Sequence, residues 1–189
     1  MSTENGLQPL VLLHGSADYN VPIIARYGLA GLNDHPTLAV NPKYAVFYTR
    51  QHFTESVQLY CTVWYPKEGD VKASSPSNTF YSIQSLLEET TRLKISQDIE
   101  DSLRGKKPAE YIASELQRLK YAKQLLAPDR LGGYFSMDLL QNAEENPGLV
   151  NIDQLFDELL KCQLVCCNGK TADQIASDIL VALALQAKY

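Results

Sequence analysis

Residues 9 to 16, PLVLLHGS, combine an apolar run with a histidine, a glycine and a serine. An apolar run of this length predicts a buried strand. When a strand ends in a tight turn, the backbone N–H that follows it can stabilise the oxyanion of a tetrahedral intermediate. The chemistry that this stretch would serve is therefore acyl transfer, provided that a nucleophile and a general base lie elsewhere in the chain.

The stretch resembles the oxyanion strand of the α/β-hydrolases, and the resemblance covers about seven residues. That family places its nucleophile on a G-x-S-x-G elbow and its catalytic histidine late in the chain. This chain contains no G-x-S-x-G, and its three histidines, His14, His35 and His52, all lie in the first third. We therefore interpret residues 9 to 14 as a buried strand and Gly15-Ser16 as its turn.

A second enzyme hypothesis needs no motif. Polar side chains at the end of a strand are a frequent place for catalytic groups. The residues His14, Asp18, Tyr19 and Asn20 follow the first apolar run. An unpatterned active site at this turn is one alternative function. A deep pocket that holds His14 with a perturbed carboxylate would favour it, whereas a flat apolar patch would favour protein assembly.

The four cysteines allow two other kinds of site. Cys162 and Cys166 are one helical turn apart and, with Cys167 and either His52 or Cys61, could ligate zinc. The spacing supplies only half of the usual pair of cysteine elements, so we expect Cys162 to pack in the core. A Cys61–His52 nucleophile pair is disfavoured for a similar reason, because Cys61 shares the apolar face of its strand. We predict no metal site.

Nucleotide cofactors are not expected either. Neither the P-loop pattern G-x-x-x-x-G-K-[ST] nor G-x-G-x-x-G occurs in the sequence. With no catalytic or cofactor-binding residue assigned, we expect a protein that acts without a cofactor and without catalysis.

Nucleic-acid binding is a second alternative function. Residues 104–130 contain seven basic and three acidic residues, a local charge of +4, although the whole chain carries −5. On a helical wheel these basic side chains do not form one stripe, so a solvated helix surface is the preferred interpretation. We therefore expect no nucleic-acid partner.

Length and composition place the chain among ordinary globular proteins. It has 189 residues, of which 45% are hydrophobic and 21% charged, values typical of a folded domain. The longest apolar run, residues 179 to 185, is far shorter than the roughly 20 residues that span a bilayer. The first residues lack the basic and hydrophobic regions of a signal peptide. A cytoplasmic protein with reduced thiols and no membrane partner is the expectation.

The elements that would position these residues fall into two groups. Residues 1–69 read as sheet-rich, with strands expected at 9–14, 37–41, 44–50 and 56–65. Residues 70–79 read as a loop or linker, and 80–189 as a helical part. The fold class is therefore α+β: a mostly antiparallel N-terminal sheet followed by four or five helices. Whether the two parts form one domain stays open, as does the structure of VPIIARYGLAG, residues 21–31.

Five expected helices can be placed along the second part of the chain. A helix or broken helix beginning near Ile83 is expected to end at Gly105, and Pro108 opens a second. A short third helix is expected to start at Ser136. The last two helices have the clearest start patterns, Asn151 with Gln154 and Thr171 with Gln174, each of which is a capping residue with its partner three positions on. Asn168-Gly169 is the expected turn between them.

Two positions on the clearest strand point to a protein interface. In ESVQLYCTVWYP, Tyr60 and Trp64 lie on the face opposite Cys61 and Val63. Large amphipathic rings are enriched at protein interfaces. The alternative, that helices cover both faces of the sheet and that Tyr60 and Trp64 are interior, carries equal weight.

The last helix supplies a second interface hypothesis. Between Ile179 and Leu185 it is apolar all round, because Val181 and Leu185 occupy positions where the polar side should continue. Such a segment must be enclosed on both sides. Since few later residues could cover it, we expect it to support self-association or docking. The expected function is accordingly a small non-catalytic binding or assembly subunit that acts as a scaffold through protein–protein contacts.

Overall fold

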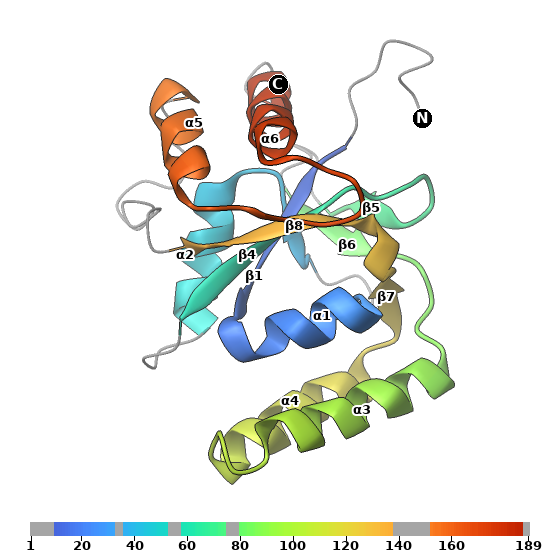
Figure 1. The fold of residues 1–189 in the computed structure, drawn as a ribbon. Helices are drawn as coiled ribbons and strands as arrows, with labels where there is room; N and C mark the ends of the chain where they lie inside the picture. Colours follow the sequence, from blue (N-terminus) through green and yellow to red (C-terminus); the bar gives the residue numbers. More distant parts are fainter. Residues whose placement is uncertain (1–9, 33–35, 53–57, 75–79, 138–151, 187–189) are drawn as a thin grey trace.

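An antiparallel sheet with helices on both faces forms the centre of the molecule (Figure 1). The structure is a computed structural model, and it describes residues 10–32, 36–52, 58–74, 80–137 and 152–186. Within these residues the sheet has seven strands in the order β5-β6-β3-β1-β4-β8-β9. They are β1 (Leu12–Ala17), β3 (Leu38–Ala39), β4 (Leu59–Trp64), β5 (Val71–Ala73), β6 (Phe80–Ile83), β8 (Leu131–Ser136) and β9 (Val165–Cys166). The predicted α+β class is confirmed.

The helices are interspersed among the strands. In the described part of the chain there are six α-helices: α1 (Val21–Tyr27), α2 (Pro42–His52), α3 (Glu89–Leu103), α4 (Ala109–Tyr121), α5 (Ile152–Lys161) and α6 (Ala172–Gln186). Short 3-10 turns at Asp18–Asn20 and Pro128–Arg130 precede α1 and β8, and a separate ladder pairs β2 (Leu29–Gly31) with β7 (Gln124–Leu126). The expected order of sheet followed by helices is therefore only roughly right. None of the described helices is both long and apolar enough to cross a bilayer.

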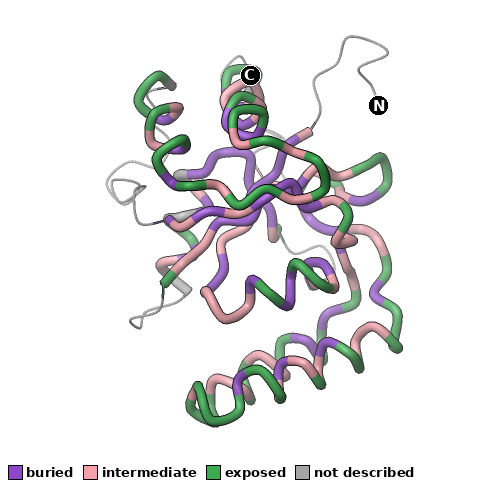
Figure 2. The backbone as a smooth tube through the Cα atoms, in the orientation of Figure 1, coloured by how far each residue is buried: buried purple, intermediate pink, exposed green. Residues whose placement is uncertain are grey.

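Strand β4 shows why both faces of the sheet are apolar. Its side chains alternate as predicted: Cys61 and Val63 belong to the core on one face, and Trp64 belongs to the core on the other. Trp64 is fully buried, and its Nε1–H donates a hydrogen bond of 2.8 Å to Thr62 Oγ1. The predicted surface position of Trp64 is thus wrong, and the interior alternative describes it. Burial along the central strands is visible in Figure 2.

Three apolar clusters hold the layers together. The first lies between the sheet and helices α2, α5 and α6, and includes Leu13, Phe135 and Ile179. The second lies on the opposite face, where Leu12 packs with residues of α1, β2 and β7. The third joins α1 to the α3–α4 hairpin and includes Ile99. Because the second and third clusters both draw on α1, this short helix connects the sheet to the outer hairpin.

Residues 44–50 form a helix, although a strand was expected there. Pro42 begins α2, where its missing N–H costs no helical hydrogen bond. The buried Ala45 and Thr49 are four residues apart, and the Thr49 hydroxyl donates to the Ala45 carbonyl at 2.5 Å. The aromatic and β-branched residues of this stretch favour strands in isolation. Packing of one helical face against the sheet overrides that preference.

Gly15 and Ser16 continue strand β1, so the predicted turn at these residues is wrong. They pair with Cys61 and Tyr60 of β4. A Cβ atom at position 15 would overlap the side chain of Thr49. The glycine is therefore required by the close approach of α2 to the sheet rather than by a turn.

The second half of the chain also departs from the prediction. Residues 80–83 form strand β6, and the following helix begins at Glu89 and ends at Leu103. Its buried face consists of Ile95, Ile99 and Leu103, whereas Leu86 and Leu93, apolar residues in the range of the expected helix, are 74% and 61% exposed. Helix α4 begins directly after Pro108, as predicted.

Strand β8 was missed, and a helix had been expected to begin at its last residue, Ser136. The continuation of that predicted helix falls in residues 138–151, outside the described part of the chain. The Gly132-Gly133 pair suggests a turn, yet both glycines lie in the strand. A Cβ on Gly132 would collide with the ring of Tyr65, and one on Gly133 would lie 2.9 Å from Ile175 Cδ1. The sheet therefore needs both residues to be small.

The final helices agree with the prediction. The backbone N–H of Gln174 donates to Thr171 Oγ1 at 3.2 Å, which is half of the predicted capping box. Asn168 and Gly169 have φ values of 53° and 82°, the left-handed conformation of the expected turn. Asn151, the other predicted cap, lies outside the described residues.

The predicted linker at residues 70–79 contains strand β5, and residues 75–79 lie outside the description. Strand β5 pairs with β6, so the chain crosses from the first part to the second within the sheet. Strands β6, β8 and β9 come from residues 80–189 and join the same sheet as β1 and β4.

Candidate functional site: a pocket where β1 and β3 separate

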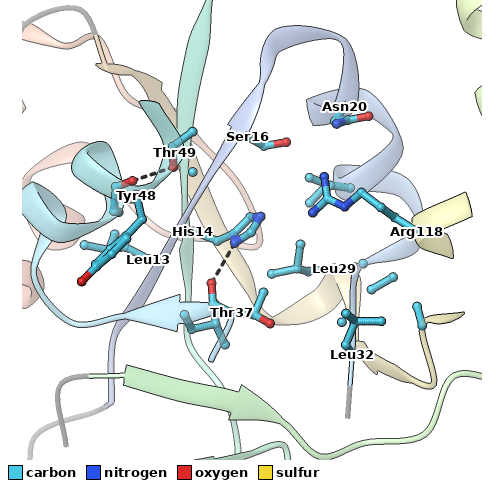
Figure 3. A pocket seen from close by; sticks show the side chains of 18 of the residues that line it. Leu13, His14, Ser16, Asn20, Leu29, Leu32, Thr37, Tyr48, Thr49 and Arg118 are labelled. Atoms are coloured by element: carbon cyan, nitrogen blue, oxygen red, sulfur yellow. Dashed lines mark hydrogen bonds between the residues drawn. The ribbon is translucent and has the colours of Figure 1, made fainter. Parts of the chain in front are cut away.

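A pocket of about 550 Å³ opens beside strand β1. Its walls come from β1, β2, β3 and from helices α1, α2, α3 and α4 (Figure 3). This volume is within the range of small-molecule sites, roughly 300 to 1,000 Å³. Segments distant in sequence meet here, because the pocket lies between the sheet and the layer that contains α1 and the α3–α4 hairpin.

The pocket exists because β1 and β3 pair at a single position. Leu13 lies opposite Ala39, and no later residue of β1 pairs with a described residue of β3. The Asp18 N–H bonds to the Gln58 carbonyl at 2.8 Å in the β1–β4 register. By the alternation of an antiparallel ladder, the polar backbone groups of Gly15 therefore face the side of β3. A strand edge consequently borders the pocket.

His14 occupies the position where the ladder would continue. Its Nδ1 lies 2.8 Å from the Thr37 carbonyl oxygen. A continued ladder would offer this carbonyl to the N–H of Gly15. With Nδ1 donating, the other ring nitrogen, Nε2, is an acceptor in the neutral tautomer. That edge of the ring faces the end of the pocket where Asn20 and Arg118 lie (Figure 3).

Three hydrogen-bonding side chains converge at this end. Ser16 projects from β1, Asn20 from the turn before α1, and Arg118 from α4 (Figure 3). Ser16 is only 4% exposed, and its hydroxyl bonds to no described residue. The Asn20 side chain makes no cap hydrogen bond, nor one to any other residue that the structure describes. Ser16 is buried and Asn20 is half-buried, and the polar groups of both are accessible from the pocket, where a ligand or water can bond to them.

Charge at this end is balanced by one acid. Glu115, one helical turn before Arg118, also lines the pocket. Its Oε1 lies 3.8 Å from Arg118 Nη1, which is an ion-pair distance but too long for a hydrogen bond. The side chain of Arg118 is 51% exposed, so its guanidinium reaches both solvent and pocket.

The remainder of the wall is apolar and ends in aromatic rings. Ile23, Leu29 and Leu119 are among the aliphatic lining residues. At the α2 end, the rings of Tyr44 and Tyr48 each lie 5.6 Å from the ring of Phe80, measured between centroids. The pocket thus combines an apolar body with one polar end, the usual composition of a small-molecule site.

The alternative active site at residues 14–20 is only partly assembled. His14 and Asn20 line the pocket, whereas Asp18 and Tyr19 do not. Asp18 Oδ1 accepts the N–H of Tyr19 at 2.8 Å, and the Tyr19 ring lies under the Lys107 ammonium at 5.0 Å. The pocket therefore unites two of the four suggested residues.

The carboxylate with a shifted pKa lies elsewhere. Asp70 is at the start of β5, and its Oδ2 accepts hydrogen bonds from Arg130 Nε and the Lys67 N–H, both at 2.7 Å. Burial acts to raise the pKa of Asp70, but the Lys67 N–H, the Arg130 guanidinium and the Ser85 hydroxyl outweigh it and hold the pKa below its ordinary value. Asp70 does not line the pocket, and its ion pair joins the residue before β5 to the 3-10 turn before β8.

The cysteines are distributed over the fold. Cys61 is fully buried, and burial strongly raises the pKa of its thiol. Cys162 is buried in the same cluster, whereas Cys166 is exposed in the edge strand β9. No three metal-ligating side chains come together among the residues that the structure describes.

The predicted interface residues separate into different environments. Tyr60 is half-buried, and its ring packs edge-on against that of Tyr134 at 6.1 Å. Val181 is half-buried, and Leu185 is 41% exposed on α6. Most other apolar residues of α6 pack in the first cluster of this same chain. Val181 and Leu185 are therefore accessible, as is the exposed Ala184 between them.

The basic residues of 104–130 are spread over several elements. Arg104 pairs with Glu100 on α3, and Arg130 pairs with Asp70 and Asp129 beside β8. Arg118 lies at the pocket. The absence of a nucleic-acid partner stays a prediction.

Sequence reasoning missed Ser16 and Arg118 as site residues. Ser16 was assigned to a turn, and Arg118 was considered only as part of a basic surface. The i, i+2 spacing of His14 and Ser16 on a strand places both on one face, and this was the available indication. Comparison of the chain with protein-family models, with curated proteins and with solved structures finds no match, so the geometry of the pocket is the basis for a functional proposal.

Proposed function

We propose that this protein is a non-catalytic binding protein whose principal site is the pocket between β1 and helix α4. The observation that carries the proposal is the Ser16 hydroxyl, which lines a cavity of about 550 Å³, belongs to a residue that is only 4% exposed, and makes no hydrogen bond to a described residue. The oxygen of this hydroxyl is accessible from the cavity and is not sealed in the core. A ligand in the cavity would therefore find a hydrogen-bonding group at this position.

Binding is favoured over catalysis for a chemical reason. A hydrolytic site needs a nucleophile and a base within hydrogen-bond reach. His14 and Ser16 are two residues apart on one strand, and the His14 ring is hydrogen-bonded to Thr37. We therefore propose that His14 serves to bond the Thr37 carbonyl and to form part of the pocket wall.

The experiment tests ligand binding after a large side chain is introduced at the polar end of the pocket. Asn20→Trp places a large ring at the polar end, and Ala25→Trp on the exposed side of α1 is the matched control, since Ala25 does not line the pocket. Titration with the uncharged solvatochromic dye Nile red should give saturable binding of one dye. Asn20→Trp should weaken this binding at least tenfold, and Ala25→Trp should leave it unchanged. Equal binding by both variants, or no saturable binding by the parent protein, would overturn the proposal.

Assembly through protein contacts is a second candidate function. The observation that favours it is a group of exposed apolar side chains on α5, β9 and α6, namely Leu160, Val165 and Leu185. Exposed apolar side chains on neighbouring elements are a feature of protein interfaces. In this proposal the protein acts as a scaffold subunit. The exposed free thiol of Cys166 supports placing it in a reducing compartment such as the cytoplasm.

A further inference from the structure

The polar end of the pocket identifies a class of ligand. We propose that the site binds a monocarboxylic acid with an apolar body, whose carboxylate lies among Ser16, Asn20 and Arg118. This inference rests on the proposed binding function and adds the chemistry of the ligand to it.

The three side chains suit a carboxylate because all of them can donate hydrogen bonds. The Ser16 hydroxyl carries one O–H donor, the Asn20 amide two N–H donors and the Arg118 guanidinium five, part of which already face other groups such as Glu115. They come from three separate elements and point toward one another across the end of the pocket (Figure 3). Guanidinium groups bind the two oxygens of a carboxylate in a planar, bidentate geometry. A group with two acceptor oxygens therefore complements the donors of these three side chains, while His14 Nε2 and the Glu115 carboxylate are the acceptors near the same end.

Glu115 limits the charge of the ligand. Its carboxylate lies 3.8 Å from the Arg118 guanidinium and lines the same pocket. A dianionic phosphate ester placed on Arg118 would be repelled by Glu115 more strongly than a monoanion, because the repulsion grows with the charge of the ligand. The pair of residues thus favours a carboxylate over a phosphate.

The rest of the pocket requires an apolar body. From the Ser16 end the wall continues through Ile23 and Leu29 and reaches the rings of Tyr44, Tyr48 and Phe80. Removal of apolar ligand surface from water against this wall favours binding. Aliphatic and aromatic bodies both suit such a wall. The proposed ligand is therefore a carboxylate on an apolar body of either kind, and the experiment distinguishes the aliphatic from the aromatic kind.

The test compares ligands that differ only in the polar group. Isothermal titration calorimetry is performed with decanoate, 1-decanol and decyl phosphate, and with 2-naphthylacetate and 2-naphthylethanol as the aromatic pair. Whichever of decanoate and 2-naphthylacetate binds more tightly should bind about tenfold more tightly than the alcohol with the same apolar body. The reason is that charge-assisted hydrogen bonds are about twice as strong as neutral ones. Decyl phosphate should bind more weakly than decanoate, and Glu115→Gln should reduce that difference.

Substitutions assign the preference to the proposed residues. Arg118→Gln should remove most of the preference for the carboxylate while leaving the alcohol affinity within about twofold. Ser16→Ala should weaken carboxylate binding severalfold. Arg104→Gln is the matched control, since Arg104 is also exposed and paired with a glutamate one turn away but lies outside the pocket. Circular dichroism checks that each variant is folded.

Each outcome bears on a different statement. If alcohol and carboxylate bind equally, or if the phosphate binds best, the inference about the carboxylate is wrong while the binding function stands. A carboxylate preference that survives Arg118→Gln also contradicts the inference. If none of these ligands binds, and Nile red does not bind either, the proposed function itself falls.

Discussion

The imidazole Nδ1 of His14 lies 2.8 Å from the carbonyl oxygen of Thr37, and this contact marks the point at which β1 and β3 stop pairing. The His14 side chain bonds to the Thr37 carbonyl, which a continued ladder would otherwise offer to the backbone N–H of Gly15. The sheet therefore opens beside Gly15 without leaving the Thr37 carbonyl unbonded. The pocket is a consequence of this local exchange of hydrogen bonds.

Replacement of His14 tests this relationship. His14→Phe keeps a ring but removes the donor, and it should lower the free energy of unfolding by about 1 to 2 kcal/mol because this hydrogen bond to the Thr37 carbonyl is lost. For a chain of this size, thermal unfolding followed by circular dichroism should show a decrease in Tm of about 2 to 8 °C. His14→Asn retains an N–H near the Nδ1 position and should be less destabilised. Equal stability of His14→Phe and the parent protein would show that the contact is dispensable.

Acid should weaken the ion pair between Asp70 and Arg130. The pKa of Asp70 is lower in the folded protein than its ordinary value of 3.8. The ionised carboxylate therefore stabilises the fold at all pH values above about 4, and this stabilisation is lost as the pH falls through the lower folded pKa. Asp70→Asn should cost about 2 kcal/mol at neutral pH, and the difference from the parent protein should shrink below pH 4.

Asp129→Asn is the control for this measurement. Asp129 bonds to the same guanidinium at 2.7 Å, but its side chain is largely exposed, so its removal should change the unfolding free energy by less than about 1 kcal/mol. A difference between Asp70→Asn and the parent that stays constant from pH 7 to pH 2.5 would contradict the assigned role of Asp70.

Charges on α6 test the assembly candidate. Val181→Glu combined with Leu185→Glu should produce a smaller particle in light scattering and an unchanged circular dichroism spectrum, if these residues form an interface. Ser177→Glu, on an exposed position of the same helix, should leave the particle size unchanged. Loss of the fold in the double variant would instead show that Val181 belongs to the intramolecular core. A parent protein that is monomeric at all concentrations would remove self-association, and docking to another protein would be the remaining form of this candidate.

Local patterns predicted several elements correctly from the residues alone. The alternation of Cys61 and Val63 with Thr62 and Trp64 predicted a strand, since side chains of an extended chain point to opposite faces. The Thr171 cap and the Asn168-Gly169 turn positioned α6 for reasons that lie within a few residues. Such features depend on backbone geometry and short-range hydrogen bonds, which the sequence specifies directly.

Only the tertiary structure decided which faces are covered and where the sheet opens. The aromatic run at 44–50 became helix α2 because Ala45 and Thr49 pack on the sheet beside Gly15. Gly132 and Gly133 became part of a strand because neighbouring side chains and backbone approach them closely. Arg118 meets Ser16 at one pocket because an α3–α4 hairpin packs under α1. These outcomes depend on contacts between segments roughly 30 to 100 residues apart, and no local window of sequence contains that information.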